Sequence, residues 1–333
     1  MISGWHFLFL AWQNPKHQHL RPRAACAASA RACATPRHAT PRHATRSHGQ
    51  MKMDFMVPGI SKCGTTTLCY LLGEHPQIFV PAFKEPHHFI RADLESDAEA
   101  YRALFAAATP EQLCGEGSQM YATPQFEELV STRLQQNNPQ MKLIFCVRNP
   151  LKRIESSYRE FHHSGAKYAV NAPFGISQAI AGLPALLQDS HYWQRLQPFR
   201  QRFGDGQILV VFLEDLQRDA QHELARCYRF LGVDATFQNP SAGTRLNSQE
   251  EKRYDTRLLR FLRTNPHTGF KLAKIPLPMQ ERFFTAVGMR PRFRGALDWE
   301  PGSREYVVQT LRDDIQRLLA YCNKAADYWP EFA

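Results

Sequence analysis

The chain has 333 residues and a formal net charge of +10, and this length suits one α/β domain of about 250–300 residues. Seven of the ten surplus positive charges lie in residues 1–50, which contain no Asp or Glu, so the rest carries only +3. The folded part is therefore mildly basic, which suits a protein that binds small anions and argues against a nucleic-acid partner.

The first fifty residues do not have the composition of a folded domain. They contain a degenerate five-residue repeat with almost no apolar content, at Ala34–His38, Ala39–His43 and Ala44–His48. Such a segment cannot bury enough surface to offset its ordering entropy. We therefore expect residues 1–50 to be a disordered extension, or the start to be misassigned upstream of Met51 or Met53. The domain then spans residues 51–333.

The same segment also bears on targeting. The apolar run at 7–12 is too short to span a membrane and lacks the basic flank of a signal peptide. An Arg-rich, acid-free start is compatible with an organelle transit peptide, which stays open. No later stretch approaches the length of a membrane span.

The cysteines indicate a reducing compartment. None forms a C-x-x-C pair, and Cys69 and Cys146 lie within apolar runs. This is typical of buried free thiols and not of a disulfide framework or a zinc site. We expect a cytoplasmic protein without a bound metal.

Apolar runs alternate with helical patterns from residue 54 onward. Expected strands lie at 54–58, 77–81, 112–116, 141–148 and 207–214, and expected helices at 64–74, 97–108, 124–137, 150–164, 185–203 and 219–231. Several strands are continuously apolar, as in a parallel sheet covered on both faces. The pattern predicts a doubly wound α/β domain with about five parallel strands, followed by a helical C-terminal part that ends in a helix near 303–323. Ligands of such sheets bind beyond the carboxyl ends of the strands.

The strongest motif follows the first strand, at Gly59-Ile-Ser-Lys-Cys-Gly-Thr-Thr-Thr-Leu68. Glycines before a helix start typically hold a phosphate against backbone N–H groups. In nucleotide triphosphatases the Lys follows the second glycine, whereas Lys62 precedes Gly64. Three threonines are poor helix formers, which favours a role for their hydroxyls beside an anion. The alternative is an ordinary capped helix, for which one Thr suffices.

A second motif follows the fourth strand, at Val147-Arg-Asn-Pro-Leu-Lys-Arg-Ile-Glu-Ser156. Asn149 can cap a helix whose first residue is Pro150. Arg148 then lies at the carboxyl end of the strand, where its guanidinium can bind a phosphate through two hydrogen bonds. The alternative makes Arg148 an ion-pair partner and Ser156 an ordinary polar side chain.

A third motif, Lys84-Glu-Pro-His-His-Phe89, follows the second strand. Pro86 disfavours helical geometry at Glu85, so an extended segment is expected there. A carboxylate in an anion-binding cleft would act as a general base. The alternative is a surface glutamate. His87 and His88 are expected to pack and to form hydrogen bonds, not to bind a metal.

Together these motifs resemble the sulfotransferases that use 3′-phosphoadenosine 5′-phosphosulfate (PAPS). The resemblance is nearest to the heparan sulfate O-sulfotransferase branch and its bacterial relatives, over residues 53–235. It implies that Ser61, Lys62, Gly64, Thr65 and Thr66 hold the 5′-phosphosulfate. Arg148 and Ser156 would bind the 3′-phosphate, with Lys62 also neutralising the leaving phosphate and Glu85 acting as the base.

The chain departs from this family in two places. Where glycosaminoglycan-modifying members carry a lysine after the third strand, this chain has Gly117, which puts an acidic polysaccharide acceptor in doubt. The family also has a further nucleotide-binding loop with the sequence Lys-Gly-Arg, and no clear match to it occurs late in this chain. Arg245, Lys252 or Arg253 could take its place, and the spacing does not choose among them.

The sequence thus predicts sulfuryl transfer from PAPS to a hydroxyl group, such as that of a carbohydrate or small molecule, with no metal. A P-loop small-molecule kinase is the alternative, because it would explain the first loop. The acceptor and the oligomeric state are not predicted.

Overall fold

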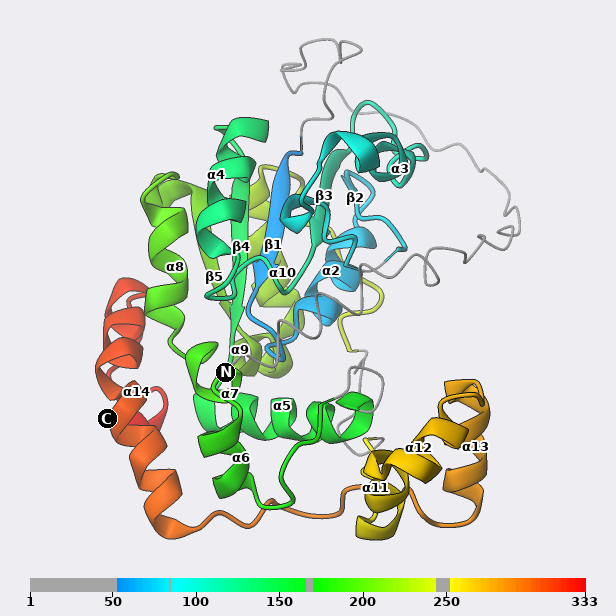
Figure 1. Cartoon of the computed structure of the whole chain (residues 1–333). Coiled ribbons are helices and arrows are strands. Elements are labelled where there is room, and N and C mark those ends of the chain that lie inside the picture. Colours follow the sequence, from blue (N-terminus) through cyan, green and yellow to red (C-terminus); the bar gives the residue numbers. More distant parts are fainter. Residues whose placement is uncertain (1–52, 84, 166–169, 244–251) are drawn as a thin grey trace.

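The five strands of the described residues form one parallel sheet (Figure 1). The computed structural model describes residues 53–83, 85–165, 170–243 and 252–333, so the expected extension at 1–50 lies outside the described residues. The sheet order is β2-β3-β1-β4-β5, and every pairing is parallel. The strands are β1 (Phe55–Gly59), β2 (Ile78–Phe79), β3 (Leu113–Gly117), β4 (Lys142–Val147) and β5 (Ile208–Phe212). The predicted fold class is confirmed, and each strand lies within its predicted range or one residue beyond it.

Helices cover both faces of the sheet, as the continuously apolar strands require. In Figure 1, α4 and α8 lie on one face, and α2 and α10 lie on the other. The helices before residue 240 are α2 (Thr65–Gly73), α3 (Ala98–Ala103), α4 (Glu127–Asn137), α5 (Pro150–Ser164), α6 (Ile176–Gly182), α7 (Ala185–Gln188), α8 (Tyr192–Arg200), α9 (Leu213–Arg218) and α10 (Ala220–Leu231).

Several boundaries differ from the expectation. The helix expected at 97–108 ends at Ala103, and the one expected at 124–137 begins at Glu127. The helix predicted at 185–203 is split into α7 and α8, because Asp189 and Ser190 turn toward Arg153 and hydrogen-bond its guanidinium. The strand predicted at 207–214 ends at Phe212, where α9 begins at once.

The C-terminal part is helical, as predicted. Helices α11 (Arg257–Thr264), α12 (Pro266–Leu272) and α13 (Leu277–Ala286) gather at one side of the molecule near the end of α5 (Figure 1). The last helix, α14 (Pro301–Tyr321), packs along α8, where the Asp314 carboxylate accepts the backbone N–H groups of Trp193 and Gln194 at 2.9 Å each. None of the helices in the described ranges is long and apolar enough to cross a membrane.

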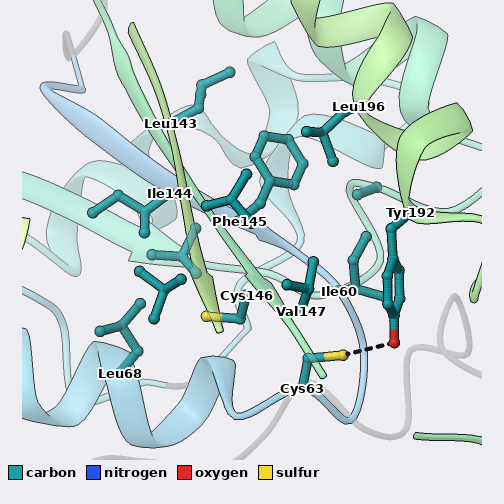
Figure 2. Close-up of a cluster of buried hydrophobic side chains, with 14 of the residues drawn as sticks. Ile60, Cys63, Leu68, Leu143, Ile144, Phe145, Cys146, Val147, Tyr192 and Leu196 are labelled. Carbon is teal, nitrogen blue, oxygen red and sulfur yellow. Dashed lines mark hydrogen bonds between the residues drawn. The ribbon is translucent and has the colours of Figure 1, made fainter. Parts of the chain in front are cut away.

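Strand β4, which lies between β1 and β5, is buried in the core. Its residues Leu143 to Val147 are at most 1% exposed, and they pack beside Ile60 and Leu68 of the neighbouring loop and helix (Figure 2). The six cysteines of the described residues are free thiols, four of them buried, in agreement with the predicted cysteine usage.

A buried ion pair joins α5 to the break between α7 and α8. The Arg153 guanidinium lies 2.9 Å from Asp189, and the two side chains are 1% and 2% exposed. Arg153 also donates to the Leu186 carbonyl and the Ser190 hydroxyl, at 2.9 Å each. These contacts make Arg153 an internal tether of α5.

We predict that Arg153→Ala lowers the free energy of unfolding by about 3–5 kcal/mol, because it leaves the Asp189 carboxylate buried without its cation. Arg218→Ala is the control, since Arg218 is 73% exposed and its partner Asp215 keeps a second ion pair with Lys324. That variant should lose less than about 1 kcal/mol. Urea titration of both variants checks this, and equal losses would contradict the assignment of Arg153 as a tether.

Candidate active site

The loop between β1 and α2 has the backbone of an anion-binding turn. Lys62 and Gly64 both adopt left-handed conformations, with φ of 67° and 92°. A Cβ atom at Gly64 would lie 2.6 Å from a Leu213 methyl group, so both the backbone angle and the space require glycine here. Among the described residues, no side chain caps the N-terminus of α2. Its first N–H groups are therefore available to a ligand anion.

Lys62 belongs to a three-residue ion network with Glu160 on α5 and Lys252. The Glu160 carboxylate lies 2.9 Å from the Lys62 ammonium and 2.7 Å from that of Lys252. Burial favours the neutral acid, but the charge of Lys62 and the hydrogen bond from Lys252 outweigh it and hold the pKa of Glu160 well below its usual range. The sequence did not reveal this pairing.

The same ion network contains one of the three residues considered as substitutes for the Lys-Gly-Arg loop of the resembling family. Lys252 reaches the partner of Lys62, whereas Arg253 is directed to the Arg290 carbonyl at 2.8 Å. Arg245 lies outside the described residues. Of the three residues that spacing could not separate, the structure brings Lys252 to the loop.

Arg148 follows β4 and lies next to the same loop. The Tyr192 hydroxyl donates to the Arg148 carbonyl at 2.7 Å and lies 3.7 Å from the Cys63 thiol (Figure 2). Burial raises the pKa of the Cys63 thiol to about 11, although the charges of Arg153 and Arg148 act against this rise. Cys63 is therefore a protonated packing residue near neutral pH.

The start of α5 has the predicted form. Asn149 caps the helix by accepting the N–H groups of Leu151 and Lys152, and Pro150 occupies the first turn. Ser156 lies farther along the same helix and is 8% exposed. Arg153, which lies between the two candidate phosphate ligands in the motif, is the internal tether described above.

The conformation predicted for Glu85 is wrong. Its φ is 55°, in the left-handed region, and that of His87 is 53°, so the segment from Glu85 to His87 is irregular and not extended. Glu85 lies 3.7 Å from the His87 ring and accepts a hydrogen bond from the Gln119 amide at 3.3 Å. Left-handed residues other than glycine cost energy and tend to persist at functional sites.

Gln119 connects the loop between β1 and α2, the candidate phosphate loop, to Glu85. Its side-chain oxygen accepts a hydrogen bond from the Ser61 hydroxyl at 2.9 Å, while its NH2 group donates to Glu85. This places the candidate base one side chain away from the candidate phosphosulfate loop. Sequence analysis missed Gln119; its position after the third strand was the signal that could have found it.

A buried carboxylate on β3 holds the segment that carries Glu85. Glu116 is 1% exposed and accepts hydrogen bonds from the hydroxyls of Ser118, at 2.8 Å, and Tyr121, at 2.9 Å. These hydroxyls in turn accept the backbone N–H groups of His87, at 3.1 Å, and Phe89, at 3.2 Å. Two chains of hydrogen bonds from Glu116 thus hold the backbone at His87 and Phe89, next to Glu85.

The histidines beside Glu85 form packing and hydrogen-bond contacts, as predicted. His88 stacks on Tyr101 with ring centroids 4.0 Å apart, and its Nδ1 atom lies 3.2 Å from the Asp97 carboxylate. Within the described ranges, no group of three or more His, Cys, Asp or Glu residues could hold a metal ion.

Known proteins share this architecture. Residues 52–271 match the family model described as the sulfotransferase domain. Heparan sulfate glucosamine 3-O-sulfotransferases 3B1 and 3A1 of Mus musculus are each 28% identical over 182 residues, which is 54% of this chain and 45% of each relative. The crystal structure of a sulfotransferase from Alicyclobacillus acidocaldarius superposes with a TM-score of 0.58 at 20% identity, and covers 84% of this chain and 99% of its own.

The family match covers well over half of the chain. The chain therefore belongs to the PAPS-dependent sulfotransferase family. It spans a little less than half the length of the mouse relatives that it matches. The structural likeness supports the fold alone.

We predict a pH-dependent cost of burying Glu116. Burial raises the pKa of Glu116 from 4.5 to about 7, against the hydrogen bonds from Ser118 and Tyr121. Because the folded state then binds the proton more tightly, stability should fall as the pH rises from about 4.5 to about 7. Measured against Glu116→Gln by urea titration, the wild type should lose up to about 3 kcal/mol of relative stability over this range.

Other buried acids titrate in both proteins and cancel in this difference. Glu111→Gln, at an exposed position before β3, controls for the loss of one carboxylate. A difference between wild type and Glu116→Gln that does not change with pH would show that folding does not raise the pKa of Glu116, and would contradict the prediction.

Proposed function

We propose that this protein transfers the sulfuryl group of PAPS to the hydroxyl group of an acceptor. The observation that supports the proposal is the position of two candidate anion ligands after neighbouring strands: Lys62 before the start of α2, and Arg148 before the start of α5. The Tyr192 hydroxyl contacts both the Arg148 carbonyl and Cys63 of the first loop. A donor with phosphates at both its 5′ and 3′ positions matches two such sites, whereas a nucleoside triphosphate needs one.

The residues fit the two ends of the nucleotide. The N–H groups at the start of α2, the hydroxyls of Thr65 and Thr66, and the Lys62 ammonium would hold the 5′-phosphosulfate. Arg148 and Ser156 would hold the 3′-phosphate. Ser61 would act through Gln119, and Glu160 would hold Lys62 and Lys252 at the loop.

Glu85 would act as the general base. The Glu85 carboxylate takes the proton of the acceptor hydroxyl as the hydroxyl oxygen bonds to sulfur. The bond between sulfur and the 5′-phosphate oxygen breaks, and the electron pair stays on the phosphate, whose charge Lys62 neutralises. The products are the sulfate ester and 3′-phosphoadenosine 5′-phosphate (PAP).

A P-loop kinase is the weaker hypothesis. It leaves Arg148 and Ser156 without a role, and Lys62 stands before Gly64 instead of after it. The sulfotransferase family match supports the first proposal. A carbohydrate acceptor and a cytoplasmic location are also part of that proposal. The acceptor in the names of the mouse relatives is a property of those proteins.

We predict that the full-length protein binds PAP more tightly than 5′-AMP, because only PAP carries the 3′-phosphate. Loss of the charged hydrogen bonds in Arg148→Ala should weaken PAP binding by roughly 10- to 100-fold and leave that of 5′-AMP unchanged. Isothermal titration calorimetry with both nucleotides measures this. Equal affinities for PAP and 5′-AMP in the wild type would contradict the proposal and favour the kinase.

We further predict that Glu85→Gln retains PAP binding and loses turnover by a factor on the order of 10²–10⁴, since the amide cannot accept the proton. Single-turnover transfer of labelled sulfate from PAPS measures the chemical step. A parallel loss of nucleotide binding and turnover would argue that Glu85 shapes the site instead of acting as the base.

A further inference from the structure

The three helices α11–α13, the helical unit at residues 257–287, carry an unusual share of exposed apolar surface. Seven of the twelve large apolar or aromatic side chains that are exposed in the described ranges lie between Leu258 and Val287. The unit lies at one side of the molecule, near the end of α5 (Figure 1). Single exposed apolar side chains are normal, but a concentration of them marks an interaction surface.

Helix α11 turns part of its apolar face away from the body of the protein. Of its apolar residues, Leu259 is buried, but Leu258 and Phe261 are each 59% exposed. A cation faces inward instead, because the central carbon of the Arg260 guanidinium lies 3.8 Å from the centre of the Phe174 ring. A surface helix normally buries its apolar side chains and exposes its charges. The packing of the domain therefore does not account for the two outward side chains.

Helix α13 and the residue that follows it present a row of exposed apolar side chains. Met279, Phe283 and Val287 are spaced four residues apart, which places them on one face of the helix. They are 62%, 61% and 51% exposed. A neighbouring face packs inward, since Gln280 and Phe284 are buried. The helix is thus held through one face, and the described residues leave a second, apolar face uncovered.

The helical unit is also the basic part of the domain. Residues 257–287 contain six Lys or Arg and one acid, a net charge of +5. Because residues 51–333 carry only +3, the rest of the domain has a net charge of −2. The acid, Glu281, forms an ion pair with Arg290 at 3.0 Å. Four of the six cations are exposed: Arg257, Lys271, Lys274 and Arg282.

These charges discriminate among the occupants of the surface. A second copy of the chain would bring the same +5, and residues 1–50 contain seven Lys or Arg and no acid, so both would be repelled. A dissolved polyanion would attract the cations but would leave Phe261 and Phe283 in water. A bilayer with anionic lipids suits both features, because apolar side chains enter the boundary of the acyl chains while Lys and Arg stay among the headgroups.

We propose that the helical unit α11–α13 docks on the surface of a bilayer that contains anionic phospholipid. The exposed side chains of α11 and α13 enter the bilayer surface to a depth of about 5–10 Å, and the exposed cations contact the lipid phosphates. This docking is independent of the proposed sulfuryl transfer, so each proposal can fail without the other.

Co-sedimentation of the full-length protein with vesicles tests the docking. One set of vesicles is phosphatidylcholine alone, and the other contains about one third phosphatidylglycerol. We expect binding to the anionic vesicles to be at least about tenfold tighter than to the neutral ones. Phe261→Ser/Phe283→Ser should weaken it at least about tenfold, because two inserted side chains are lost. The control Leu129→Ser/Tyr306→Ser changes exposed side chains on α4 and α14 and should bind like the wild type.

A second pair of variants tests the charges, and it also serves if the serine variant fails to fold. Lys271→Glu/Arg282→Glu reverses two exposed charges of the helical unit and should weaken binding to the anionic vesicles at least about tenfold. Arg229→Glu/Arg312→Glu makes the same change in net charge at exposed positions of α10 and α14. This control should bind like the wild type.

Failure of the wild type to bind anionic vesicles would overturn the proposal and leave an acidic protein as the partner to seek. Binding that neither α11–α13 variant weakens would overturn it too, and would assign the contact to residues 1–50. Binding that only the charge reversal weakens would show an electrostatic contact without insertion. A wild-type dimer that Phe261→Ser/Phe283→Ser converts to a monomer in sedimentation equilibrium would assign the surface to a second copy.

Discussion

The site depends on the parallel pairing of β1 with both of its neighbours. Met56 lies opposite Glu116 of β3 on one side and Leu143 of β4 on the other, so the three strands end at the same edge of the sheet. From β1 the chain continues to β2 and β3 on one side of the sheet and then to β4 and β5 on the other side. In sheets of this kind, ligands bind where the strand order reverses in this way. The loop with Lys62 follows β1, Gln119 follows β3, and Arg148 follows β4. This strand order brings the three close together.

Local strain and buried hydrogen bonds balance each other at this edge. Lys62, Glu85 and His87 are all left-handed, a conformation that costs non-glycine residues on the order of 1 kcal/mol or more each. The relay from Glu116 through Ser118 and Tyr121 holds the segment that carries two of them. The bridge through Gln119 connects that segment to the loop that carries the third. The site is thus held in shape from inside the sheet.

The strands could be predicted from sequence because each is a continuous apolar run. Their ends could be predicted because the residues that begin the next helix follow closely along the chain. Lys62, Arg148 and Glu85 were predicted as site residues for the same reason, because each was expected to follow a strand. The partners of these residues could not be found. Glu160 and Gln119 are 98 and 58 residues from their partners in the phosphate loop, and no local pattern indicates such pairs. The conformation of Glu85 was missed because proline only disfavours a helix before it and does not specify an extended chain.

A crystal structure of the full-length protein with bound PAP tests the central claim most directly. The account predicts the 5′-phosphate at the start of α2, within hydrogen-bond distance of the Lys62 ammonium and the N–H groups of Thr65 and Thr66. The 3′-phosphate should contact Arg148 and Ser156. A nucleotide bound elsewhere, or one whose 3′-phosphate points into solvent, would contradict the account.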